Sequence, residues 1–128
     1  MSRSILLIED NEQNRYLVTF LLAQHGYEVH AVTDGMRGIE AARTFVPLLI
    51  LLDIQLPGMD GYAVARALRQ NLALQAVPIV AVTSYAMPGD REKALEAGCT
   101  GYLEKPINPD TFVAEVERAL VPPDEEAP

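Results

Sequence analysis

The chain has 128 residues, 49% of them hydrophobic, which is the size and composition of one ordinary globular domain with a substantial core. The 18 acidic and 10 basic residues give a formal net charge of −8, which disfavours nonspecific binding to nucleic acids or to anionic membranes. The single cysteine, Cys99, excludes an intramolecular disulfide, and the longest apolar run is far shorter than a membrane span, so we expect a cytoplasmic protein.

Apolar runs and turn residues predict a regular alternation of five strands and five helices. In chain order the expected elements are a strand at Ser4–Glu9, a helix from Asn11 or Glu12 to Gly26, a strand at Tyr27–Val32, a helix from Asp34 to Arg43, a strand at Leu48–Leu52, a helix at Tyr62–Gln70, a strand at Pro78–Val82, a helix at Pro88–Gly98, a strand at Gly101–Glu104 and a helix from Asn108 to Leu120. Loops rich in proline, glycine and aspartate separate them.

Helix caps and apolar stripes refine this pattern. Asp34 and Asp60 are expected to cap the helices that follow them, because aspartate is favoured at the N-cap. The segment Asn108–Asp110 combines a cap, a proline and an acid, as the first turn of a helix does. Phe20 and Met36 fall on the predicted apolar stripes of the first two helices.

Five strand–helix units joined by short connections predict a three-layer α/β/α, doubly wound domain with a five-stranded parallel sheet. We assume the flavodoxin-like strand order 2-1-3-4-5, since the alternation alone does not fix it. The domain is expected to span residues 1–121. Residues 122–128 are rich in proline and acids and are expected to form a disordered acidic tail.

Charged side chains follow three of the expected strands at the point where each strand ends. Glu9 and Asp10 close the first run, Asp53 closes the third and Lys105 follows the fifth. Ligands of open α/β sheets bind at the carboxyl ends of the strands, so these groups should converge. Clustered carboxylates suit a hard divalent cation, and a lysine beside them suits a phosphoryl group.

Four motifs, each after its own strand, resemble those of the receiver domain of two-component response regulators over about residues 3–120. The matching segments are Glu9–Asn11, Asp53–Gly61, Val82–Ser84 and Gly101–Pro106. Ala86–Asp90 with Ala97–Cys99 is further similar to single-domain regulators of cell division and polarity and to receivers of hybrid histidine kinases.

This resemblance implies that Asp53 accepts a phosphoryl group from a phosphohistidine. It implies that Glu9, Asp10, Asp53 and the backbone carbonyl of Gln55 hold Mg²⁺, a cation that prefers few carboxylates and the substrate phosphate. It also implies that Lys105 pairs with the phosphoryl oxygens.

The resemblance assigns further residues to switching and to rate. Thr83 would donate its hydroxyl to a phosphoryl oxygen, and Tyr102 would rotate into the space that Thr83 leaves. Gln55, Ser84 and Tyr85 occupy the positions that govern access of water and of the donor histidine. Because Tyr85 is bulky, we expect slow loss of the phosphoryl group.

The implied protein is a single-domain switch that acts on no separate substrate. Its partners would be a histidine kinase or histidine phosphotransfer protein and an unidentified downstream protein, and it would be a monomer or a phosphorylation-dependent dimer. One alternative is a Mg²⁺-dependent phosphohydrolase with Asp53 as nucleophile, although Gln55 stands where such enzymes carry a second acid. Another is a degenerate receiver that binds partners without phosphorylation. Simpler interpretations remain open too: Glu9 and Asp10 could merely cap the first helix, and Tyr102 could be a static aromatic.

Overall fold

The computed structural model describes residues 3–84 and 87–120, and within them strands and helices alternate as expected. The strands are β1 (Ser4–Ile8), β2 (Glu28–Val32), β3 (Leu49–Asp53), β4 (Ile79–Thr83) and β5 (Gly101–Glu104). The helices are α1 (Glu12–Gln24), α2 (Gly35–Thr44), α3 (Gly61–Arg69), α4 (Asp90–Glu96) and α5 (Phe112–Ala119), with a 3₁₀ helix, η1 (Leu72–Leu74), after α3. The short η1 had no counterpart in the sequence prediction.

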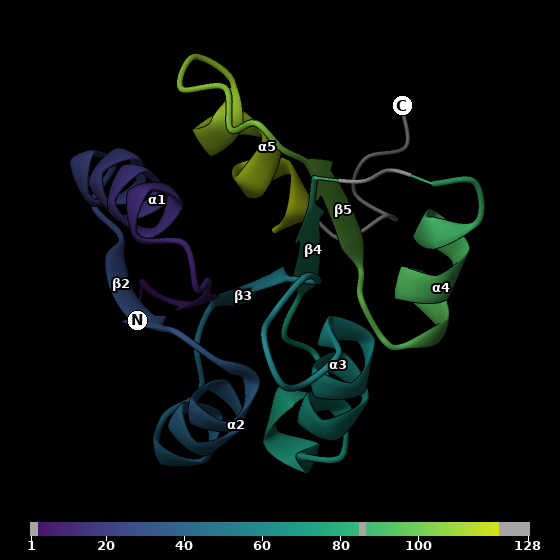
Figure 1. Ribbon diagram of the computed structural model, residues 1–128. Helices are drawn as coiled ribbons and strands as arrows, with labels where there is room; N and C mark the ends of the chain where they lie inside the picture. The colour runs from purple at the N-terminus through teal and green to yellow at the C-terminus, as the bar shows by residue number, and fades with distance from the viewer. Residues whose placement is uncertain (1–2, 85–86, 121–128) are drawn as a thin grey trace, which may run out of the picture.

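The strands form one parallel sheet in the order β2-β1-β3-β4-β5, so the assumed strand order is confirmed. Figure 1 shows α1 and α5 on one face of the sheet and α2, α3 and α4 on the other. Each face has its own buried apolar cluster, one packed under α1 and α5 and the other under the remaining helices. The domain therefore has the expected three layers.

The burial of each strand explains its composition. β3 and β4 are buried along their whole length and β1 from its second residue on, which is why their sequences are nearly continuous apolar runs. β2 lies at one edge of the sheet and has no fully buried residue. The polar side chains of Glu28 and His30 are exposed there, as the alternating sequence of β2 predicts.

The strand register brings the carboxyl ends of the central strands to one level. Partners at this edge are Ile8 with Leu52, Asp53 with Val82, and Thr83 with Glu104. The residues that follow β1, β3, β4 and β5 therefore emerge side by side, and this is what allows side chains far apart in sequence to form one site.

Local hydrogen bonds start the first three helices at the predicted positions. The side chains of Asn11, Asp34 and Asp60 each accept a hydrogen bond from a backbone N–H of the helix that follows, at 2.9–3.0 Å. These bonds satisfy donors that have no partner inside the helix. The predicted caps at Asp34 and Asp60 are confirmed.

The predicted start of the last helix was wrong. The Asn108 side chain accepts a hydrogen bond from the Asp110 N–H at 3.0 Å, and its carbonyl accepts one from the Phe112 N–H at 2.9 Å. These bonds close a turn in front of the helix, so α5 begins only at Phe112. Asparagine and aspartate favour such local turns as strongly as they favour caps, and the sequence pattern does not separate the two.

Two residues of the predicted apolar stripes are exposed. Phe20 is 48% exposed and stacks on Tyr16, with ring centroids 6.4 Å apart, while Met36 is 61% exposed. On α1 the buried residues are Val18, Leu21 and Leu22. A stripe rotated by one residue fits the helical period equally well, and packing against the sheet selects the aliphatic one.

No helix in the described part of the chain combines the length and the apolar character needed to cross a bilayer. The expected acidic tail at residues 122–128 and the rate-governing Tyr85 lie outside the described residues.

Candidate metal centre and phosphoacceptor

Three carboxylates meet at the carboxyl edge of the sheet. Glu9 and Asp10 follow β1 and Asp53 is the last residue of β3, and one carboxylate oxygen from each lies within 4.8 Å of the others. Glu9 and Asp53 are each 3% exposed, whereas Asp10 is open to solvent. The convergence predicted from the strand ends is therefore found in the structure.

Lys105 lies between the two buried carboxylates. Its Nζ is 2.9 Å from Glu9 Oε1 and 3.3 Å from Asp53 Oδ2. The Lys105 N–H also donates to the carbonyl of Thr83 at 2.8 Å, which extends the pairing of β5 with β4 by one step and fixes where the lysine starts. The peptide bond from Lys105 to Pro106 is cis.

Burial and neighbouring charges move the pKa values of this cluster. Burial raises the pKa of Glu9, the hydrogen bond from Lys105 lowers it in part, and the adjacent Asp53 raises it again. Burial alone would lower the pKa of Lys105, but its hydrogen bonds and charge pairing with Glu9 and Asp53 raise it above the ordinary value. Lys105 is therefore protonated at neutral pH.

Hydrogen bonds orient the phosphoacceptor candidate and join two loops above it. The Gln55 N–H donates to Asp53 Oδ1 at 2.9 Å, so one carboxylate oxygen is held by the backbone and the other faces Lys105. The Gln55 side-chain carbonyl accepts a hydrogen bond from the Ser84 N–H at 3.1 Å. Sequence reasoning assigned Gln55 and Ser84 separately and missed this link, because no local pattern relates positions so far apart.

The acidic loop after β1 is held by two further contacts. The Asn11 N–H donates to Glu9 Oε2 at 3.1 Å, and Arg15 Nη1 donates to the backbone carbonyls of Glu9 and Asp10 at 3.2 and 3.3 Å. Arg15 was not singled out from the sequence. Its position one turn into α1, facing back toward the loop, is the signal that could have identified it.

Thr83 and Tyr102 lie on the neighbouring strands. Thr83 is 4% exposed and ends β4. Tyr102 is half-buried and packs against the apolar cluster under α2, α3 and α4, and its hydroxyl is buried without a hydrogen-bond partner among the described residues. Burial and the charges of Asp90 and Glu104 raise the Tyr102 pKa, so this hydroxyl is neutral at physiological pH.

The donor set fits a hard divalent cation. Three carboxylates and one ammonium group give the cluster a formal charge of −2, and the oxygen atoms near one another are those that Mg²⁺ prefers. Asp10, the exposed member, leaves the cluster accessible from solvent. Glu9, Asp10 and Asp53 are the residues that could hold the ion.

Comparison with known proteins agrees with this geometry. The family model of the response regulator receiver domain matches residues 5–117. The polar-differentiation response regulator DivK of Brucella ovis is 38% identical over 120 residues, which are 94% of this chain and 98% of that protein.

Solved structures with the same fold include two bacterial receivers. The chemotaxis protein CheY4 of Vibrio cholerae has a TM-score of 0.88 and 28% identity, covering 93% of this chain and 99% of that one. The receiver domain of the sensor histidine kinase PA1611 from Pseudomonas aeruginosa PAO1 has a TM-score of 0.84 and 36% identity, over 94% and 98% of the two chains. That structure has a magnesium ion coordinated in its active site cleft.

The family match spans most of the chain, and the acidic cluster lies at the edge of the sheet where the fold places its ligands. This chain belongs to the response regulator receiver domain family of two-component signalling proteins.

Proposed function

We propose that this receiver accepts a phosphoryl group on Asp53 from the phosphohistidine of a histidine kinase or a histidine phosphotransfer protein. The observation that carries the proposal is the position of the buried Asp53 carboxylate, 3.3 Å from a protonated lysine and beside two further carboxylates. A buried carboxylate held in such surroundings has a role other than packing, because burial of unneeded charge is costly.

Asp53 is the nucleophile. An Asp53 carboxylate oxygen attacks phosphorus, the bond from phosphorus to the donor imidazole nitrogen breaks, and that nitrogen keeps the electron pair. The Gln55 N–H holds the carboxylate in place through Oδ1. Lys105 offsets the charge on the transferred oxygens, and the Thr83 hydroxyl donates a hydrogen bond to one of them.

A magnesium ion would be held by Glu9, Asp10, Asp53 and the Gln55 carbonyl. When bound, it neutralises charge on the phosphoryl oxygens. Because Lys105 already pairs with Glu9 at 2.9 Å and with Asp53 at 3.3 Å, the protein itself supplies only part of the positive charge that three carboxylates and a phosphoryl group require.

The signal leaves the site through Thr83 and Tyr102. Thr83 moves toward the phosphoryl group, and Tyr102 turns into the space that it leaves, which changes the face formed by α4, β5 and α5. The buried Tyr102 hydroxyl supports this assignment, since a polar atom without a partner among the described residues loses little by moving. α4 is also lightly anchored: Ala94 is buried, but Leu95 is 55% exposed.

The partners are proteins of a cytoplasmic phosphorelay. The donor is a kinase or phosphotransfer protein, and the target is a protein that binds the changed face, with dimerisation of the phosphorylated form as one outcome. Tyr85, outside the described residues, is proposed to slow hydrolysis, and the protein promotes only its own phosphorylation and dephosphorylation.

The test is an intact-mass measurement after incubation with acetyl phosphate or phosphoramidate, with and without Mg²⁺. We expect a Mg²⁺-dependent gain of one phosphoryl group in wild type and none in Asp53→Asn. Asp60→Asn is the matched control, because Asp60 is an exposed cap in the same loop and asparagine also caps helices. No gain of mass in wild type would favour a degenerate receiver. Rapid consumption of many equivalents of the phosphodonor per protein would favour a phosphohydrolase.

A further inference from the structure

A groove lies beside β5, at the open edge of the sheet, and the proposed phosphoryl chemistry does not use it. Its volume is about 710 Å³, and it is lined by parts of α3, α4, β5 and α5. Within the described chain β5 pairs only with β4, so its outer backbone edge faces this groove. The apolar lining consists of Val77, Pro78, Val80, Leu103, Ala119 and Leu120.

The groove is positively charged although the protein is acidic. Among its described lining residues are three arginines, Arg69, Arg91 and Arg118, and one acid, Glu115, so its formal charge is three minus one, or +2, on a chain of net charge −8. No carboxylate of the described residues forms a salt bridge with any of the three arginines. Glu115 instead accepts a hydrogen bond from the Thr111 hydroxyl at 2.7 Å.

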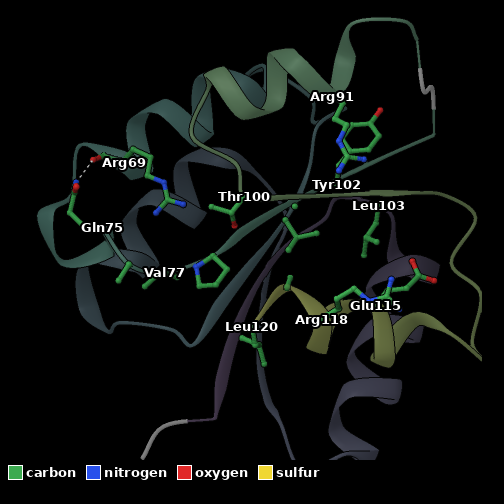
Figure 2. Close-up of a pocket in the computed structure, with 15 residues that line it drawn as sticks. Arg69, Gln75, Val77, Arg91, Thr100, Tyr102, Leu103, Glu115, Arg118 and Leu120 are labelled. Atoms are coloured by element: carbon green, nitrogen blue, oxygen red, sulfur yellow. Dashed lines mark hydrogen bonds between the residues drawn. The ribbon is translucent and has the colours of Figure 1, made fainter. Parts of the chain in front are cut away.

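The arrangement of the arginines favours an extended acidic ligand. Arg69 ends α3, Arg91 is on α4 and Arg118 is on α5, and Figure 2 shows them spread around the groove instead of converging on one point. Arg69 already donates to the backbone carbonyls of Gly98 and Leu74 at 2.8 and 2.6 Å, so Arg91 and Arg118 supply most of the attraction. A chain segment that carries several acids can reach more than one.

We propose that the C-terminal segment of this chain, residues 121–128, binds in this groove through its acids Asp124, Glu125 and Glu126. The described chain leads directly to it, because Leu120 is itself part of the lining. The end of α5 lies at the start of β5: a Cβ placed on Gly101 would be 3.8 Å from the Ala119 Cβ. The segment therefore begins at one end of the groove.

The length and composition of the segment match the groove. Four residues from Leu120 to Asp124 span at most about 14 Å, and the four residues of β5 span about 13 Å, so the acids reach the far end of the strand. Pro122 and Pro123 favour an extended chain. A directly attached segment also has an effective concentration on the order of millimolar, which no free ligand matches easily.

Occupation of the groove would cover Tyr102 and Leu103, which belong to the face that is proposed to change on phosphorylation. The segment would then compete with the downstream protein for this face. That consequence rests on the proposed function, whereas the binding of the segment does not and can be tested without phosphorylation.

The experiment uses the full chain with Ala127→Cys carrying a nitroxide spin label, and it records amide NMR signals. Cys99 is 3% exposed and its pKa is raised to about 11, so labelling is selective, and wild type treated in the same way checks this. We expect loss of the amide signals of Gly101–Leu103 and Arg118. The signals should return in Arg91→Gln/Arg118→Gln and in about 1 M salt, where the Debye length is about 3 Å.

The matched control is Arg43→Gln/Arg66→Gln, which removes two exposed arginines outside the groove and should leave the signal loss unchanged. Signal loss spread evenly over the surface, or equally strong in Arg91→Gln/Arg118→Gln, would overturn the proposal. A mixture of spin-labelled, isotopically unlabelled chains with isotope-labelled chains separates intramolecular from intermolecular contact. Signal loss in that mixture would show that the groove binds a second copy of the chain. If inorganic phosphate shifts the amide signals of the groove residues while the spin label has no effect on them, the groove binds a small anion instead.

Discussion

At the scale of single residues, the site is organised by the sharing of one cation. Lys105 is closer to Glu9, at 2.9 Å, than to Asp53, at 3.3 Å, so it pairs with a candidate metal ligand as well as with the candidate phosphoacceptor. A divalent ion among the carboxylates would weaken the ion pair between Glu9 and Lys105. The lysine would then be available for the oxygens of a phosphoryl group on Asp53.

Cys99 provides a residue-scale test of burial through the dependence of stability on pH. Burial raises its pKa from 9.0 to about 11, with Arg69 opposing part of the rise. The folded protein therefore keeps the thiol proton at pH values where the unfolded chain releases it, so the free energy of unfolding must fall as pH rises through this range. Between about pH 8 and about pH 10.5 the contribution of Cys99 should fall by about 2 kcal/mol.

Urea denaturation of wild type and Cys99→Ala at both pH values measures this contribution. The stability difference between the two proteins isolates Cys99, because tyrosines with raised pKa values, such as Tyr27 and Tyr62, contribute equally to both. A difference that does not change with pH would mean that the thiol is not buried in solution.

At the scale of elements, α3 packs closely against the 54–60 loop, which follows Asp53 at the end of β3. Gly61, the first residue of α3, donates its N–H to the Ile54 carbonyl at 3.1 Å, and a Cβ at this position would lie 2.7 Å from the same oxygen. The clash is with backbone, which cannot turn away as a side chain can. Glycine is needed here for close approach.

Gly61→Ala should therefore displace α3 from the 54–60 loop and destabilise the protein by about 1–3 kcal/mol. Because the loop contains Gln55, whose N–H holds Asp53, phosphorylation by acetyl phosphate should slow as well. Chemical denaturation and the intact-mass assay measure the two effects.

Gly58→Ala is the comparison, because Gly58 has a positive φ of 79° but open space around a Cβ, so it probes backbone strain without a clash. Unchanged stability of Gly61→Ala would show that the contact is loose.

At the scale of the whole molecule, the carboxylate cluster stores electrostatic repulsion that an ion can relieve. Three carboxylates within 4.8 Å, with one lysine, leave the folded state with two uncompensated negative charges. The unfolded chain does not hold these groups together. Binding of a divalent ion to the folded state must therefore raise its stability by mass action.

We expect Mg²⁺ to raise the melting temperature. At a concentration one hundred times the dissociation constant the gain is about 2.7 kcal/mol, and roughly 4 °C per kcal/mol is typical for a domain of this size. Differential scanning calorimetry with MgCl₂, against NaCl of equal ionic strength, measures the shift. Asp10→Asn should reduce it, because Asp10 is exposed and its loss should perturb folding little. Equal melting temperatures in the two salts would argue against an ion site.

Much of this molecule follows from its sequence alone. The apolar runs predicted the strands. The charged residues after them predicted that Glu9, Asp10, Asp53 and Lys105 lie close together, because the carboxyl ends of parallel strands meet at one edge of the sheet. The caps at Asp34 and Asp60 were equally predictable, since each side chain accepts a hydrogen bond from a backbone N–H only two or three residues away. These features depend on local chemistry or on a rule of topology.

Only the tertiary structure decided the rest. Tertiary packing determines which stripe of α1 is buried, and Phe20 remains at the surface. It also determines that Asn108 forms a turn before α5 instead of capping the helix. It placed the Gln55 side chain on the Ser84 N–H and Lys105 between Glu9 and Asp53. In each case local sequence allows more than one arrangement of similar energy, and packing against distant parts of the chain selects one of them.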